Sequence, residues 1–138
     1  MSGRDGTEPV SRDELLYRRI PVSKGWYDER NGVSPEAFDP RKDEIGGISL
    51  FRNKYKTVKE VAKGPSKRGY YVAVLRAGDL IKEGIHIVPR PDPPHGPGHI
   101  ELPGLTCENR LTSEALERKL ALARLCLQVE GPFLQSAD

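Results

Sequence analysis

The chain has few of the residues on which redox, metal and covalent chemistry usually depend: two cysteines, three histidines, one methionine and one tryptophan among 138 residues. Cys107 and Cys126 lack the C-x-x-C spacing of zinc and redox motifs. No signal-peptide core and no apolar run of membrane-spanning length is present. These absences predict a cytoplasmic protein with reduced thiols and no membrane partner.

The common phosphate-binding and nucleophile motifs are also missing. No Walker A, G-x-G-x-x-G or G-x-S-x-G pattern occurs, which disfavours a standard nucleotide loop and a serine-hydrolase elbow. His95 and His99 are four residues apart, but the local sequence PPHGPGH is incompatible with a helix that would place them on one face. We therefore expect no cofactor and no metal, with ring nitrogens bonded to backbone carbonyls; a zinc site completed by Asp92, His86 or Cys107 is the alternative.

What the chain does contain is enough apolar sequence for one small core. Hydrophobic residues make up 36% of it and charged residues 30%, and its length is typical of a single domain. The opening MSGRDGTEPV is small and polar, so we expect residues 1–10 to form a disordered tail. Residues 11–138 are expected to form a single α+β domain.

Short β-rich runs alternate with turn signals along this domain. Residues 69–75 are the most apolar run and predict a central strand, flanked by the strands that hold Tyr17 and either Phe51 or Ile100. Asn31-Gly32 predicts a tight turn within a hairpin. The other expected strands cover residues 15–21, 48–52, 85–88 and 99–102, and short helical segments are expected over 35–38, 57–64 and 77–84.

The longest periodic segment lies near the C-terminus. Residues 113–129 place Leu116, Leu120, Ala123 and Leu127 at three- and four-residue spacing, which predicts an amphipathic helix ended by Gly131-Pro132. We expect those four side chains to meet the sheet. The predicted fold is thus a small mixed or antiparallel sheet packed against a C-terminal helix.

Positive charge is concentrated in one block. Residues 52–68 carry seven basic side chains and one acidic side chain, while the whole chain has a net charge of only +2. Such a block suits an anionic partner, and interleaved aromatic rings make nucleic acid one candidate. We therefore interpret the protein first as an interaction module for a protein or an anionic ligand. Its candidate binding residues are Arg18, Arg52, Lys54, Tyr55, Lys56, Lys63, Arg68, His95 and His99.

The adjacent arginines of the first strand form a second candidate feature. On a strand, Arg18 and Arg19 point to opposite faces of the sheet. Arg19 shares the face of Tyr17 and Pro21, so we predict that Arg19 is the buried one. A buried arginine requires a carboxylate or a ligand phosphate, and the expected partner is Asp43 or Glu44.

A resemblance gives a different interpretation. The runs LYRRIP at residues 16–21, AFDP at 37–40 and ISLFR at 48–52 resemble a set of short uncharacterised bacterial proteins, over roughly residues 15–105. The layout is also loosely similar to ADP-ribosyltransferase-like and RES-type folds, which consume NAD. This similarity implies NAD as the cofactor, and it implies catalytic roles for Arg18 or Arg19, for Ser49 or Tyr55, and for Glu101. Arg19, Ser49 and Glu101 are the preferred set. The chain lacks the S-T-S run, the [QE]-x-E pair and the GGRWN-like segment of those families. A binding protein is therefore preferred over an enzyme.

Overall fold

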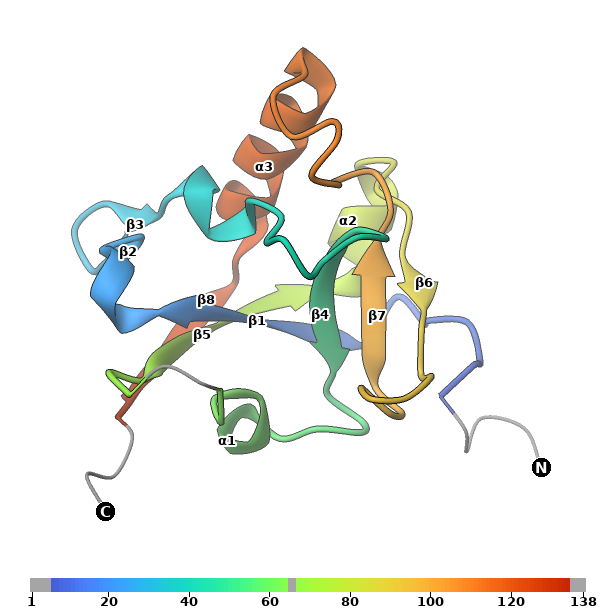
Figure 1. Ribbon diagram of the computed structural model, residues 1–138, viewed down its shortest axis with the longest axis horizontal. Helices are drawn as coiled ribbons and strands as arrows, with labels where there is room; N and C mark the ends of the chain where they lie inside the picture. The colour runs from blue at the N-terminus through green and yellow to red at the C-terminus, as the bar shows by residue number, and fades with distance from the viewer. Residues whose placement is uncertain (1–5, 65–66, 135–138) are drawn as a thin grey trace.

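The computed structural model describes residues 6–64 and 67–134, and its centre is a six-stranded antiparallel sheet. The strand order is β6-β7-β4-β1-β5-β8 (Figure 1). The predicted α+β class, with an antiparallel sheet and a C-terminal helix, is confirmed. The strands are β1 (Leu15–Pro21), β4 (Ile48–Arg52), β5 (Tyr70–Arg76), β6 (Val88–Pro89), β7 (His99–Leu102) and β8 (Gln128–Phe133), and β2 (Tyr27–Asp28) pairs with β3 (Gly32–Val33) in the predicted hairpin.

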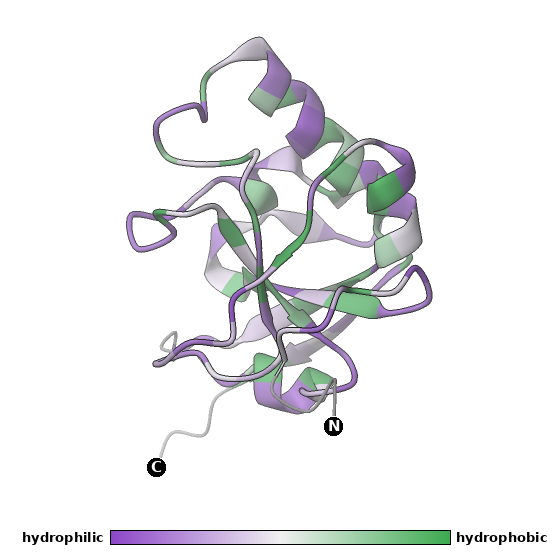
Figure 2. Cartoon of the chain, turned by 90° about the vertical axis from the view of Figure 1, so that its right-hand side faces the viewer, coloured by the Kyte–Doolittle hydropathy of each residue, from purple (hydrophilic) through white to green (hydrophobic). Residues whose placement is uncertain are grey.

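One face of the sheet carries the main core. Strand β1 alternates regularly, so that Leu16 and Ile20 are fully buried on this face. Helix α3 (Ser113–Leu125) and the 3-10 turn η2 (Pro35–Phe38) cover it, contributing Leu122 and Phe38. Hydrophobic residues gather on the central strands while the loops are mostly hydrophilic (Figure 2). A further 3-10 turn, η1 (Val22–Lys24), leads from β1 to β2, and the helix α2 (Ala77–Lys82) leads from β5 to β6.

The opposite face is covered by a single short helix. Helix α1 (Val58–Val61) begins with the predicted capping box, in which the Thr57 hydroxyl accepts from the Glu60 amide and the Glu60 carboxylate accepts from the Thr57 amide. Its residues Val61 and Ala62 pack on Val72 of β5. This second face is only partly covered, so it leaves room for polar side chains beside α1.

The C-terminal region differs from the prediction in two ways. The helix ends at Leu125 rather than at residue 129, because Cys126 adopts an extended conformation (φ −61°, ψ 120°) and residues 128–133 continue as β8. Strand β8 pairs with β5, so the second neighbour of the central strand is β8 and not a strand holding Phe51 or Ile100. Turn residues Gly131 and Pro132 lie within this edge strand instead of ending a helix.

The predicted buried face of α3 is wrong except at Ala123, which is half-buried against the main core. Leu116 and Leu120 are 46% and 48% exposed, and Leu127, beyond the helix, is also exposed. The buried positions are Ala115, Lys119, Ala121 and Leu122. Small alanines let the helix backbone approach its neighbours closely, and the Lys119 ammonium donates to Asp39 next to η2. The helix therefore buries the face that holds Ala115, Ala121 and Leu122 and leaves Leu116 and Leu120 exposed.

The segment before β1 also differs from the expected tail. Within the described residues 6–10, Gly6 is buried and the Glu8 carboxylate bonds to Lys54 and to the Tyr55 hydroxyl. These contacts attach residues 6–10 to the turn after β4. No helix of the described residues is long and apolar enough to cross a bilayer.

Candidate functional site

The structure reverses the roles predicted for the two arginines of β1. Arg18, not Arg19, is the buried one, and it is only 4% exposed. Its Nη1 lies 2.7 Å from the Glu44 carboxylate, which is one of the two partners predicted for Arg19. The reason is the alternation of β1: Arg18 lies on the same face of the strand as Leu16 and Ile20, and this face is the one that is buried.

The Arg18–Glu44 pair is fully satisfied by its surroundings. Arg18 also donates to the carbonyls of Ala37, Asp39 and Ser49. Glu44 accepts from the amides of Arg41 and Ser49 as well. Burial disfavours the charged carboxylate, but the Arg18 cation and these bonds outweigh it, and the pKa of Glu44 lies below its ordinary value. The Arg18 guanidinium is therefore occupied by groups of the fold itself.

Arg52, another predicted binding residue, is neutralised inside the fold. It is fully buried, and its Nε and Nη2 lie 2.7 and 2.8 Å from the two oxygens of Glu14. Glu8 lies 3.3 Å from its Nη2 and 2.7 Å from Lys54. Bonds from Lys54 and Tyr55 lower the pKa of Glu8 to about 2. The first part of the basic block thus balances the charge of two glutamates.

The remaining lysines of the basic block have no such partners. Lys56 is half-buried, and Lys59, Lys63 and Lys67 are exposed. Among residues 6–64 and 67–134, none of these four lies within 4 Å of a carboxylate. Arg68 lies beside them in the exposed turn that leads into β5. Lys59 lies on α1, and Lys56 and Lys63 lie just before and just after it, on the face of the sheet opposite the main core; we call these three the lysines around α1.

A small cavity brings Arg19 and Ser49 together with a residue that the sequence did not single out. Arg19, Arg41 and Ser49 line it, along with Phe51 and the Arg18–Glu44 pair, and its volume is about 20 Å³. We call it the arginine cavity. Neither Arg19 nor Arg41 has a carboxylate within 4 Å in the described chain. Arg41 follows Pro40 in a loop that has no motif, so no sequence signal points to it.

The Arg19 side chain is held in place without an ion pair. Its guanidinium lies 5.8 Å from the Phe51 ring centre and 5.5 Å from the Tyr70 ring centre, and it donates to the carbonyl of Lys63 just after α1. Burial lowers the pKa of Arg19, and the neighbouring Arg41 cation acts in the same direction. The cavity therefore adjoins the lysines around α1.

Ser49 is held by the histidine loop. His99 is fully buried, with Nδ1 2.9 Å from the carbonyl of Arg90 and Nε2 2.8 Å from the Ser49 hydroxyl. A carbonyl only accepts, so Nδ1 carries the proton and the Ser49 hydroxyl donates to Nε2 of the neutral ring. Burial lowers the pKa of His99, and the ring of His95 stacks on it at 3.9 Å. The prediction of a histidine bonded to a backbone carbonyl is confirmed for His99.

The residues implied by the NAD-enzyme resemblance lie on three adjacent strands. Ser49 of β4 is the register partner of Glu101 on β7, and Arg19 lies on β1 next to β4. Glu101 is 3.4 Å from Arg90 and does not line the arginine cavity. Within the described chain, no group of three acidic, histidine or cysteine side chains is arranged to hold a metal.

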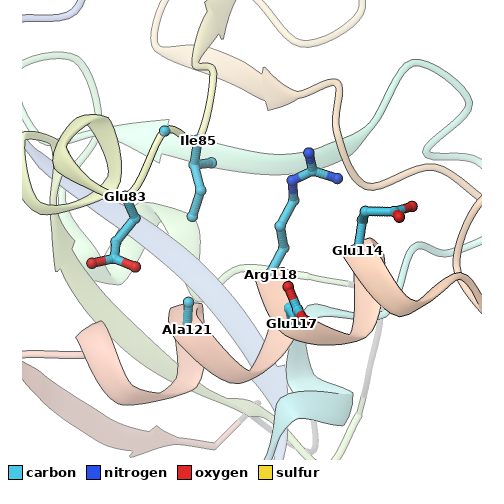
Figure 3. A pocket seen from close by; sticks show the side chains of 7 residues that line it. Glu83, Ile85, Glu114, Glu117, Arg118 and Ala121 are labelled. Atoms are coloured by element: carbon cyan, nitrogen blue, oxygen red, sulfur yellow. The ribbon is translucent and has the colours of Figure 1, made fainter.

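Larger hollows lie away from these residues. One of about 240 Å³ lies between the end of α2 and α3, with Glu83 on one side and Arg118, Glu114 and Glu117 of α3 on the other (Figure 3). Arg118 itself donates to the carbonyl of Gly104. Another, of about 560 Å³, is lined mainly by apolar side chains around Val10 and Ile85. Of the residues singled out from the sequence, the second hollow includes only His86, which was considered as a zinc ligand.

Comparison with known proteins gives no match: no family model, no curated protein and no solved structure corresponds to this chain. The interpretation of the site rests on its own geometry and charge.

Proposed function

We propose that this protein is a binding domain for an anionic ligand. The observation that supports it is the arginine cavity, where Arg19 and Arg41 lie together without a carboxylate of their own among the described residues. The buried Arg18 and Arg52, by contrast, each have a glutamate at 2.7 Å. Two neighbouring cations repel each other at a partly buried site, and an anion bound between them relieves that repulsion.

The lysines around α1 extend the same positive surface. The carbonyl of Lys63 accepts from Arg19, so the end of α1 adjoins the cavity. Lys59 lies within α1 and Lys63 follows just after its end, and both side chains are exposed. An extended anion would contact the cavity and these lysines together.

Nucleic acid remains one candidate ligand, bound through phosphates rather than bases. Tyr70 is only 2% exposed, and the Tyr55 hydroxyl is bonded to Glu8. Phe51 lies beneath the Arg19 guanidinium. These rings are therefore poorly placed for base stacking, and affinity would come mainly from phosphate contacts and depend strongly on salt.

Titration with single- and double-stranded DNA and RNA at low and moderate salt tests the proposal. Lys63→Glu is expected to weaken binding to all four without lowering the melting temperature, since Lys63 is exposed. The matched control is Lys82→Glu, at the exposed end of α2, which should leave affinity unchanged. If no nucleic acid binds at low salt, nucleic acid is not the ligand. If both variants lose the same affinity, binding depends only on the net charge of the protein and not on Lys63.

An NAD-consuming enzyme is the second candidate, favoured by the placement of Arg19, Ser49 and Glu101 on adjacent strands. Under this interpretation the arginine holds the NAD phosphates and the glutamate stabilises the positive charge that develops on the ribose. Release of nicotinamide from NAD by the purified protein, detected by NMR, tests it. Activity should disappear in Glu101→Gln and persist in Glu83→Gln; a protein that leaves NAD intact is not this enzyme.

A further inference from the structure

The arginine cavity has a net positive charge that the fold itself does not balance. Three arginines line it, Arg18, Arg19 and Arg41, and among the described residues Glu44 is the one acidic residue that lines it. Both oxygens of Glu44 are already bonded: one to Arg18 and the amide of Ser49, the other to Arg18 and the amide of Arg41. Glu44 therefore balances Arg18, and the charges of the other two arginines remain.

The size of the cavity limits what can enter it. About 20 Å³ is room for one or two water-sized groups. That space accommodates oxygens of a single anionic group, and it excludes a nucleoside or a planar ring. The ligand must therefore enter with a small charged end while the rest stays outside.

The donors available in the cavity match a phosphate group. An arginine presents several N–H groups in a planar fork, and the side chain of Arg41 makes no hydrogen bond within residues 6–64 and 67–134. Arg19 uses one donor for the carbonyl of Lys63 and is oriented by two aromatic rings, so little conformational freedom is lost when it binds. The uncompensated charge of two arginines equals that of a doubly ionised phosphomonoester.

Ser49 supplies the wall of the cavity rather than a reactive group. Its amide donates to Glu44 and its hydroxyl donates to His99, which is fixed by the carbonyl of Arg90. The hydroxyl oxygen still has a lone pair, which accepts a hydrogen bond from the P–O–H group when the phosphate is singly ionised. Ser49 is thus a positioning residue.

We propose that the arginine cavity binds the terminal phosphomonoester of a ligand, with Arg19 and Arg41 as its contacts. This inference rests on the proposed anion-binding function and makes it specific: the lysines around α1 would contribute general attraction, and the cavity would select a chain end or a small molecule that carries a free phosphate.

The first test is titration of the protein with inorganic phosphate and with phenyl phosphate, observed by NMR at the Nε–Hε signals of arginine side chains. Signals of Arg19 and Arg41 are expected to shift with saturation, and Arg41→Met should weaken binding about 10-fold or more, as expected for loss of a charged hydrogen bond. Arg124→Met, on the exposed surface of α3, is the matched control and should bind normally. If the Arg19 and Arg41 signals do not shift, the inference is wrong. It is also wrong if Arg124→Met weakens binding as much as Arg41→Met does.

The second test separates this inference from the broader proposal. Oligonucleotides with a 5′-phosphate are compared with the same sequences ending in a 5′-hydroxyl. The cavity predicts a preference for the phosphorylated end that Arg41→Met abolishes and Lys63→Glu preserves. Equal affinity for both ends, with binding still sensitive to Lys63→Glu, would overturn the cavity and leave the general anion-binding surface standing. Binding of small phosphates without oligonucleotide binding would support the cavity and overturn the role of the lysines.

Discussion

Arg18 and Arg19 are consecutive residues of one strand, yet they lie on opposite faces of the sheet and only Arg18 has a carboxylate partner among the described residues. Arg18 points into the main core, where Glu44 and three carbonyls satisfy it. Arg19 points to the other face, where it meets two aromatic rings, one carbonyl and a second arginine. Side-chain type is identical, so the difference comes from the counter-charge that the rest of the chain supplies. The charge of Arg18 is compensated inside the fold, whereas Arg19 lies beside a second cation without a carboxylate of its own among the described residues.

The largest effect is expected from removing the partner of Arg18. Glu44→Ala leaves the Arg18 cation buried without a carboxylate and removes the acceptor of the Arg41 and Ser49 amides. The free energy of unfolding should fall by about 3–5 kcal/mol, which is most of the stability of many domains of this size. Urea denaturation followed by circular dichroism measures it. A loss below about 1 kcal/mol would mean that the pair does not organise the β1–β4 core.

The same contrast between two sides of one element can be tested in α3. Leu122 is fully buried, whereas Leu120 is 48% exposed. Leu122→Ala should cost about 2–5 kcal/mol, and Leu120→Ala should cost far less because the exposed side chain leaves little cavity behind. Thermal or urea unfolding of the two variants compares them directly. If Leu120→Ala proved the more damaging change, the face that holds Leu116 and Leu120, rather than the face that holds Ala121 and Leu122, would be the one that packs.

Acid should weaken the fold through the carboxylates that pair with arginine. The folded-state pKa values of Glu14 and Glu44 lie below the ordinary 4.5, because bonds to Arg52 and Arg18 outweigh the effect of burial. The unfolded chain then takes up protons first, so the stability that they contribute is complete above pH 4.5 and is lost as pH falls through the folded values. His99 acts in the same direction from about pH 6.5 downward, because burial lowers its pKa.

Measured unfolding free energies between pH 7 and pH 3 should therefore decrease with falling pH. Glu44→Gln should show a shallower decrease than the natural protein, since one of the shifted carboxylates is gone. Arg19→Met should keep the natural slope, because Arg19 pairs with no carboxylate of the described chain. A shallower slope in Arg19→Met would show that Arg19 has an acidic partner after all.

Local sequence patterns predicted much of the fold but little of the site. The alternation of β1, the capping box of α1 and the hairpin at Asn31-Gly32 depend on neighbouring residues, and all three form as expected. Which of Arg18 and Arg19 is buried depends on which face receives α3. That choice is decided by packing between distant segments, which also exposed Leu116 and Leu120.

The number of positive charges in residues 52–68 also overestimated the free positive charge of this block, because distant segments pair with it. The seven cations of residues 52–68 look like one patch in the sequence, but Glu8 and Glu14, far earlier in the chain, neutralise Arg52 and Lys54. Arg41 was missed because a single arginine in a loop has no pattern. Its significance arises only when folding places it next to Arg19.

The smallest change in stability is expected for Arg19→Met. Methionine retains apolar contact with Phe51 and Tyr70, and the loss of one bond to the Lys63 carbonyl is offset by relief of repulsion from Arg41. The free energy of unfolding should therefore change by less than about 1 kcal/mol. Affinity for phosphate should nevertheless fall about as far as in Arg41→Met, since both guanidinium groups face the same cavity. A variant that lost several kcal/mol of stability would place Arg19 in the same structural class as Arg18, and the distinction between the two arginines would disappear.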